Sequence, residues 1–214
     1  WVSFFAFSTK DLPNLLLSLA VSLWGLRLAW YVVGRIAKTG EDKRYQEILR
    51  GYGENAQAKA FSRLFMLQAG LQYIVSAAIL RMNYTDPKPA GIATWVGMGI
   101  FAVGFFFEAV ADAQLAAFKR DPSNKGKILQ SGLWKASRHP NYFGESMVWL
   151  GLAIMSLAYP WEWLALISPV VITVLLLFVS GVPIQEKGKA ERPEWREYAS
   201  KTPRFVPFIG SKKF

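Results

Sequence analysis

The sequence predicts an all-α protein, a polytopic bundle of membrane-spanning helices. Of its 214 residues, 52% are hydrophobic and 15% are aromatic, with nine tryptophans. The apolar residues fall in long blocks, and charged residues collect at the ends of these blocks, as in integral membrane proteins. We therefore expect one integral membrane domain over residues 1–214, with about six spans.

The apolar blocks have the length of membrane helices. A helix rises 1.5 Å per residue, so about 20 residues cross the roughly 30 Å of hydrocarbon. Residues 1–8 are typical of a helix end, and the chain begins at Trp1 inside this apolar run. We expect a further membrane segment upstream, and seven spans in the full protein. The later spans are predicted at 15–36, 61–80, 92–118, 141–158 and 163–180.

The basic residues alternate in number from one loop to the next. Loops 37–60, 119–140 and 182–214 carry five, six and eight Lys and Arg, whereas segments 9–14, 81–91 and 159–162 carry one, two and none. The positive-inside rule places the basic loops in the cytoplasm. We expect a bacterial inner membrane, or the endoplasmic reticulum if the protein is eukaryotic.

The net charge is +10, and the chain has no cysteine. A cytoplasmic membrane face and an anionic cofactor explain this charge better than nucleic acid does, because the basic residues flank apolar blocks. Without cysteine, the chain can form neither a disulfide nor a thiolate ligand or nucleophile. We expect no metal site and no nucleic-acid partner.

The stretch 134–145, WKASRHPNYFGE, is the most informative part of the chain. Pro140 fits the first turn of a helix, where a missing N–H costs nothing. Arg138 and the chain's single histidine, His139, precede this turn, whose N–H groups and dipole attract anions. We therefore expect a phosphate site here, with interfacial anchoring of Arg138 and His139 as the alternative.

Asn141 and Glu145 lie four residues apart on one face of the same predicted helix. Unpaired polar groups in an apolar helix are expensive and usually functional. The next polar pair, Glu108 and Asp112, shares a face with Lys119 in the span 92–118. A structural ion pair of these carboxylates with Arg27 or Arg81 is the alternative to a functional cavity.

Gln68 and Gln72 share a face of the span 61–80. They indicate either a polar pocket between spans or hydrogen bonds that join helices, and the sequence favours neither.

Several segments taken together resemble the membrane steroid 5α-reductases, and most closely their bacterial members. These segments are SRHPNYFGE, NKGKILQSGLW before it, and SGVPIQEK and EWREYASKTPRFVPF after it. The resemblance implies a seven-helix membrane fold, with NADPH in a cytoplasmic-side cavity and a steroid that enters from the bilayer. The SRHPNY core is also similar to isoprenylcysteine and phospholipid methyltransferases.

The resemblance also implies site residues. Gln46 and Glu47 match a Gln-Glu pair near the substrate, and a tyrosine in the next helix corresponds to either Tyr73 or Gln72. The residues expected near the cofactor are Glu108, Asp112, Lys119, Lys125, Lys127, Arg138, His139, Asn141, Tyr142, Glu145 and Tyr198. Glu108 stands where eukaryotic members have asparagine.

The implied reaction is NADPH-dependent reduction of the C4–C5 double bond of a 3-keto-4-ene steroid, or of a similar polycyclic or isoprenoid enone. Hydride delivery to the β-carbon develops negative charge on the carbonyl oxygen, which needs a preplaced donor. Glu47 can donate if a dry cavity keeps its carboxyl protonated. An S-adenosylmethionine-dependent membrane methyltransferase and a non-enzymatic scaffold or transporter are the alternatives.

Overall fold

The computed structural model describes Phe5, Asp86 and the ranges 10–39, 49–82, 88–159 and 162–209. These residues form helices and turns, and no strand occurs among them. The predicted all-α class is therefore confirmed. The chain divides into two compact units, Trp1–Pro87 and Lys88–Phe214, which are described separately below.

The first unit contains two long helical segments. Helix α2 spans Leu12–Thr39 and is preceded by Asp11, whose carboxylate accepts a hydrogen bond from the Asn14 N–H at 2.9 Å. Such a cap satisfies one of the donors left unpaired at a helix start. The second segment consists of α4 (Ala56–Ala60), the π-helical turn η1 (Phe61–Phe65) and α5 (Met66–Met82), which follow one another directly.

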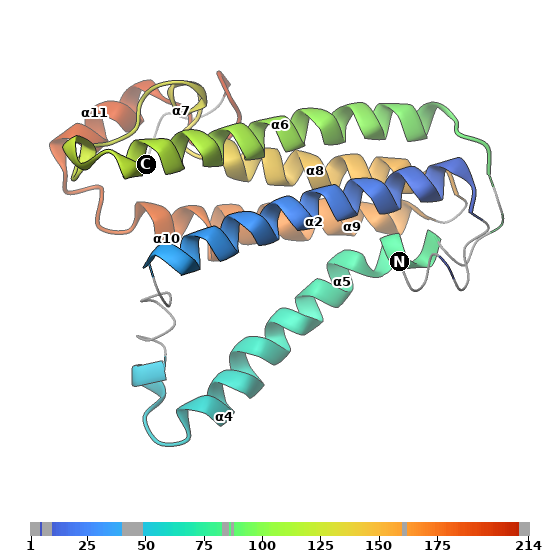
Figure 1. Cartoon of the computed structure of the whole chain (residues 1–214), viewed down its shortest axis with the longest axis horizontal. Helices are drawn as coiled ribbons and strands as arrows, with labels where there is room; N and C mark the ends of the chain where they lie inside the picture. Colours follow the sequence, from blue (N-terminus) through green and yellow to red (C-terminus); the bar gives the residue numbers. More distant parts are fainter. Residues whose placement is uncertain are drawn as a thin grey trace. The chain divides into compact units, whose positions relative to one another are not determined.

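The second unit is built around the long helix α6, which spans Ile92–Arg120, and α8, which spans Pro140–Ser156 (Figure 1). The last apolar segment consists of η3 (Glu162–Leu166), α9 (Ile167–Val174) and the π-helical turn η4 (Leu175–Val179). Shorter helices complete the unit: η2 (Pro122–Asn124), α7 (Leu133–Ala136), α10 (Val182–Glu186) and α11 (Pro193–Lys201).

Three helical segments of the described chain are long and apolar enough to cross a membrane. They are Leu12–Gly34, Ile92–Arg120 and Trp163–Glu186. Together with the helical class, they identify an all-α membrane protein. The second segment expected in the first unit, 61–80, and α8 are also helical, but the total number of crossings stays a prediction.

Helices α6 and α8 pack with their backbones in contact. Gly97 and Gly104 of α6 face Gly151 and Gly144 of α8, and each pair is spaced by seven residues, which places its members on one helix face. A Cβ atom added at Gly104 would lie 2.5 Å from the Val148 nitrogen and 2.7 Å from the Gly144 oxygen. Only glycine permits this approach, so the glycines set the distance between the two helices.

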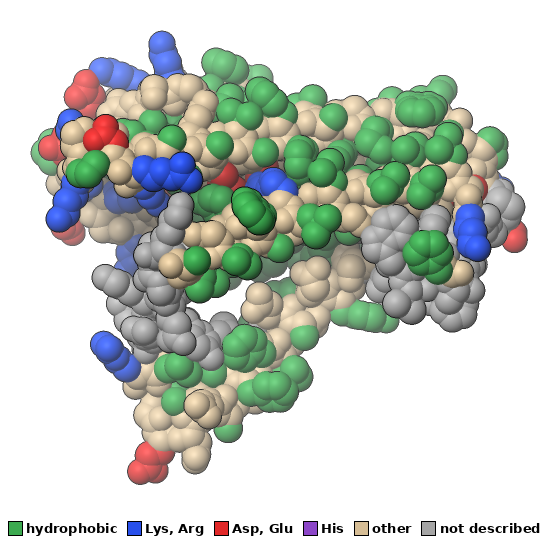
Figure 2. All heavy atoms as spheres, viewed as in Figure 1, with side chains coloured by type: hydrophobic (Ala, Val, Ile, Leu, Met, Phe, Trp, Pro, Cys, Tyr) green, Lys and Arg blue, Asp and Glu red, His purple; other side chains and the backbone are tan. Residues whose placement is uncertain are grey.

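The polar segments of the second unit meet at one end of it. The end of α6, the start of α8, α7 and α11 lie together there (Figure 1), and Lys and Arg gather over this end while hydrophobic side chains cover the long helices (Figure 2). The loop 119–140 and the tail 182–209 therefore share one side, as the charge count predicts.

We expect Gly104→Ala to lower the free energy of unfolding by about 1–3 kcal/mol, because overpacking forces the α6 and α8 backbones apart. Gly99→Ala is the matched control, since no heavy atom lies within 4 Å of a Cβ at Gly99. Its stability should be unchanged or slightly higher, because alanine favours helix more than glycine. Denaturant titration of both variants in detergent measures this, and equal stabilities would contradict the close-packed seam.

Candidate functional site

The start of α8 is buried. Arg138 and His139 are only 1% and 3% exposed. The Ser137 hydroxyl accepts a hydrogen bond from the His139 N–H at 3.1 Å and donates to the Phe205 carbonyl at 2.7 Å. Both side chains are thus enclosed by protein, which favours a role inside the protein, while the choice between a phosphate site and interfacial anchoring stays a prediction.

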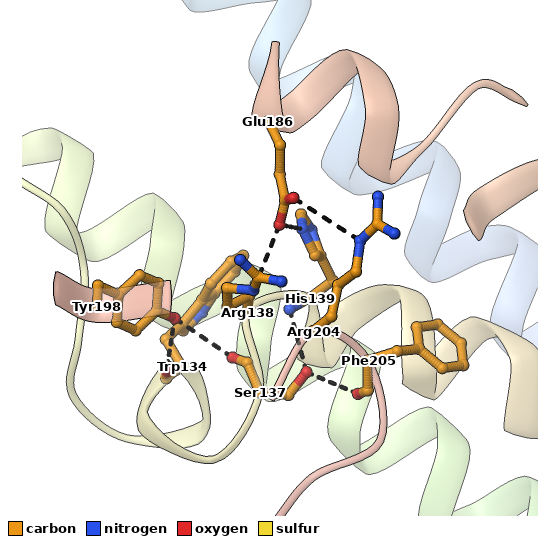
Figure 3. A network of polar contacts seen from close by, with 8 residues as sticks. All are labelled: Trp134, Ser137, Arg138, His139, Glu186, Tyr198, Arg204 and Phe205. Carbon is orange, nitrogen blue, oxygen red and sulfur yellow. Dashed lines mark hydrogen bonds and ion pairs between the residues drawn. The ribbon is translucent and has the colours of Figure 1, made fainter. Parts of the chain in front are cut away.

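A single carboxylate holds this region together. Glu186, at the end of α10, lies with Oε1 2.9 Å from His139 Nε2 and 3.4 Å from Arg138 Nε, and with Oε2 3.7 Å from Arg204 Nε (Figure 3). We call Glu186, Arg138, His139 and Arg204 the Glu186 cluster. Its members come from α10, the start of α8 and the tail, so one side chain joins three separate segments.

The protonation of His139 follows from its partner. Burial lowers the pKa of His139 below its usual value of 6.5, although the hydrogen bond to Glu186 acts in the opposite direction. The neutral ring then carries its proton on Nε2, because the carboxylate can only accept. Nδ1 is thereby left as an acceptor, and the ring stacks on Tyr142 with centroids 5.5 Å apart.

Tyr198 of α11 fixes the loop before α8. Its buried hydroxyl lies 2.5 Å from the Trp134 carbonyl oxygen and 3.4 Å from that of Ser137. Burial raises the pKa of Tyr198, so the hydroxyl stays protonated and donates to the main chain. Its predicted contact with the cofactor stays a prediction.

Asp112 and Asn141 form the second polar pair of the site. The Asn141 Nδ2 atom donates to Asp112 Oδ1 at 3.2 Å, which connects α6 to the first turn of α8. The Asn141 Oδ1 atom is buried and accepts no hydrogen bond within the described part of the chain. Glu108, also buried, lies one turn before Asp112, and its backbone N–H contacts Gly144. The glycine contact thus brings the two acidic residues of α6 against α8.

The remaining predicted residues fall into four groups. Glu145 is half-buried on α8, four residues after Asn141, whereas Lys119, Lys125 and Lys127 are exposed at the same end of the unit. Gln72 and Tyr73 are exposed on α5 in the first unit. Gln46 and Glu47 lie outside the described residues.

Sequence reasoning assigned no role to Glu186, Arg204 or Ser137. The signal that could have indicated Glu186 is its place as a carboxylate just after the apolar stretch 163–184. Its segment, SGVPIQEK, was noted only as part of a resemblance. No periodicity could have indicated that the tail folds back on Ser137, since hydrogen bonds to backbone carbonyls leave no side-chain pattern.

The sequence matches a family described as "Protein of unknown function (DUF1295)" over residues 1–202. The chain belongs to the DUF1295 family. This match covers both units, so the family spans the described helices of each. No solved structure matches the chain.

Curated relatives of this DUF1295 protein include plant reductases. The chain is 39% identical to steroid 5-alpha-reductase DET2 of Gossypium hirsutum over 67 residues, which are 31% of the chain and 24% of the relative. It is 31% identical to the Arabidopsis thaliana enzyme of the same name over 85 residues, or 38% of the chain and 31% of the relative. The resemblance to steroid 5α-reductases is thereby confirmed, over less than a third of each relative's length.

Two other relatives are of different kinds. The DUF1295 chain is 43% identical to probable O-methyltransferase ustE of Ustilaginoidea virens over 60 residues, 28% of the chain and 21% of the relative. An uncharacterised protein of Schizosaccharomyces pombe is 24% identical over 218 residues, 87% of the chain and 61% of the relative. A reductase and a methyltransferase therefore both occur among proteins similar to parts of this chain.

We expect the unfolding free energy to depend on pH through His139. Its pKa is lower in the folded protein than in the unfolded chain, so on acidification the unfolded chain takes up the proton first. Stability is therefore full above about pH 6.5 and falls as the pH drops toward the folded pKa, by at most about 1.4 kcal/mol per pH unit.

Denaturant titrations between pH 5 and 8 measure this slope, and His139→Gln should remove it. Because His139 is the chain's single histidine, its imidazole NMR signal reports the folded pKa directly. A folded pKa above 6.5 would contradict the expectation.

Proposed function

We propose that this protein is an NADPH-dependent oxidoreductase that reduces the C4–C5 double bond of a 3-keto-4-ene steroid or of a similar enone lipid. The observation that carries the proposal is the Asp112–Asn141 pair beside the buried Glu186 cluster, in a membrane protein similar to steroid 5-alpha-reductases. This combination offers polar groups for a nucleotide and apolar helices for a lipid substrate.

The residues present fit a dinucleotide. No described residue donates to the buried Asn141 Oδ1 atom, and a hydroxyl or amide group of the cofactor would supply that hydrogen bond. Exposed Lys119, Lys125 and Lys127 would meet phosphate oxygens as point charges. Bound NADPH supplies the hydride, and these residues would bind and orient it.

Asp112 would act through its partner. Its carboxylate accepts the Asn141 amide proton, so the amide is fixed with the oxygen as the remaining acceptor. A fixed acceptor can orient a bound group without reorganisation, which lowers the cost of binding. Asp112 is therefore a positioning residue in this proposal, and Asn141 is the residue that contacts the cofactor.

The proposed substrate contacts are based on the sequence resemblance alone. A protonated Glu47 carboxyl would donate a hydrogen bond to the substrate's carbonyl oxygen, with Gln46 beside it and with Tyr73 or Gln72 in support. The substrate would enter from the bilayer, and the basic loops would lie in the cytoplasm of a multi-pass membrane protein.

The similarity to probable O-methyltransferase ustE favours a second candidate, an S-adenosylmethionine-dependent membrane methyltransferase. That cofactor carries a positively charged sulfonium and no phosphate. The guanidinium groups of Arg138 and Arg204, both beside Glu186, and the lysines nearby suit a phosphate-bearing cofactor better.

We expect the detergent-solubilised protein to oxidise NADPH only when a 3-keto-4-ene steroid such as progesterone is present, and to form the 5α-reduced product. Absorbance at the NADPH band and mass spectrometry of the product measure this. Thermal stabilisation by S-adenosylmethionine without any by NADPH would instead support the methyltransferase.

We expect Asp112→Asn to raise the KM for NADPH about ten- to hundredfold, because the Asn141 amide loses its charged acceptor. Asp121→Asn is the matched control, since Asp121 is an exposed carboxylate at the same end of the unit. Steady-state kinetics at saturating steroid compare the two, and equal KM values would argue against the role of Asp112.

We expect Glu47→Gln to lower kcat by about a hundred- to a thousandfold with little change in the KM for NADPH, since the lost donor acts on the developing oxyanion. Steady-state kinetics of the variant with progesterone measure both constants. Turnover near that of the wild type would remove Glu47 from the reaction.

A further inference from the structure

The tail of the chain is fixed against the start of α8 by backbone hydrogen bonds. The Arg138 N–H donates to the Pro203 carbonyl at 2.9 Å, and the Ser137 hydroxyl donates to the Phe205 carbonyl at 2.7 Å. Arg204 lies between these two bonded residues. Its backbone position is therefore set by its neighbours on both sides, whatever its own side chain does.

The Arg204 side chain contacts Glu186 through its Nε atom. Its Nε atom is 3.7 Å from Glu186 Oε2, which is an ion pair but too long for a hydrogen bond. The Nε atom is buried and has no hydrogen-bond partner among the residues that the structure describes. The two terminal nitrogens point away from Glu186 (Figure 3), and 35% of the side chain is exposed. The guanidinium is thus positioned by Glu186, with its fork directed elsewhere.

Glu186 cannot neutralise every cation near it. It faces two guanidinium groups, those of Arg138 and Arg204, and Arg138 lies closer to it and is the more buried of the two. A third cation, Lys189, also interacts electrostatically with Glu186, and additionally with Lys119 and Arg192. Lys189 is held in place over the Trp195 ring, with its ammonium 4.6 Å from the ring centroid.

Positive charge that is partly removed from water attracts an anion more strongly than the same charge on an open surface. An arginine fork matches two oxygens of a phosphate group, whereas a lysine offers only a point charge. We propose that Arg204 is a phosphate-binding residue, held by Glu186 and by the paired tail, and that its terminal nitrogens bind a phosphate group of a ligand at the basic end of the second unit. The inference rests on the proposed function where that phosphate belongs to NADPH.

The test measures binding of inorganic pyrophosphate, because this probe carries phosphate chemistry without a nucleotide. Isothermal titration at low salt compares Arg204→Gln, Arg204→Lys and the control Lys201→Gln in detergent. Lys201 lies three residues earlier in the same tail and is 69% exposed. We expect Arg204→Gln to weaken pyrophosphate binding at least about tenfold, Arg204→Lys to weaken it less, and Lys201→Gln to change it less than about twofold.

Unchanged pyrophosphate affinity in Arg204→Gln, or no binding by the wild type, would overturn the inference. Should Arg204→Gln not fold, Arg204→Lys keeps the charge opposite Glu186 and still removes the fork. The pyrophosphate affinity of Arg204→Lys then tests the inference, and an affinity equal to that of the wild type would overturn it. Thermal melts without ligand verify that the variants are folded.

NADPH titrations separate this inference from the proposed function. Pyrophosphate binding that depends on Arg204, without any NADPH binding, would support the phosphate site and contradict the reductase. NADPH binding that is unaffected by Arg204→Gln would support the reductase and contradict a contact between Arg204 and the phosphates of NADPH. Nanodiscs with and without phosphatidic acid identify the remaining source: Arg204-dependent competition by this lipid would assign the phosphate to a lipid headgroup.

Discussion

The backbone contact between α6 and α8 is the constraint on which the site depends. Four glycines let the helices approach until the main chain of one touches that of the other, so neither helix can slide or rotate without a clash. This contact fixes which residues of α6 face the first turns of α8. Asp112 and Asn141 can pair because Gly144 lies against Glu108, one turn along each helix. The packing of small residues therefore determines the position of the polar ones.

A second constraint, electrostatic in origin, closes the end of this helix pair. The Glu186 cluster joins the last apolar segment to the start of α8 and to the tail, and Tyr198 fixes the intervening loop from the other side. Burying a charged group is costly unless it is paired, so the buried Arg138 guanidinium requires the Glu186 carboxylate. The candidate site is thus bounded by the close-packed pair α6 and α8 and by the ion pairs of the Glu186 cluster.

The sequence predicted the helices well, and it singled out only some of the residues that meet at the candidate site. Hydrophobic blocks found the long helices to within a few residues, because lipid imposes a length on any segment that crosses it. Asn141 and Asp112 were identified since polar groups in apolar helices are conspicuous. Glu186 and Arg204 were missed, because their meeting depends on how the tail folds back. The glycines of α6 and α8 did not predict the contact between these helices either, because glycine spacing indicates a packing face only once the partner helix is known.

The position of Arg204 in the chain has a consequence for biosynthesis. Translation runs from the N-terminus, and residues 203–208 leave the ribosome after every other described part of the second unit except Ile209. The helices can pack before the tail arrives, and until then the half-buried carboxylate of Glu186 lacks its ion pair with Arg204. Formation of the Arg204–Glu186 ion pair is therefore among the last steps in the assembly of the second unit.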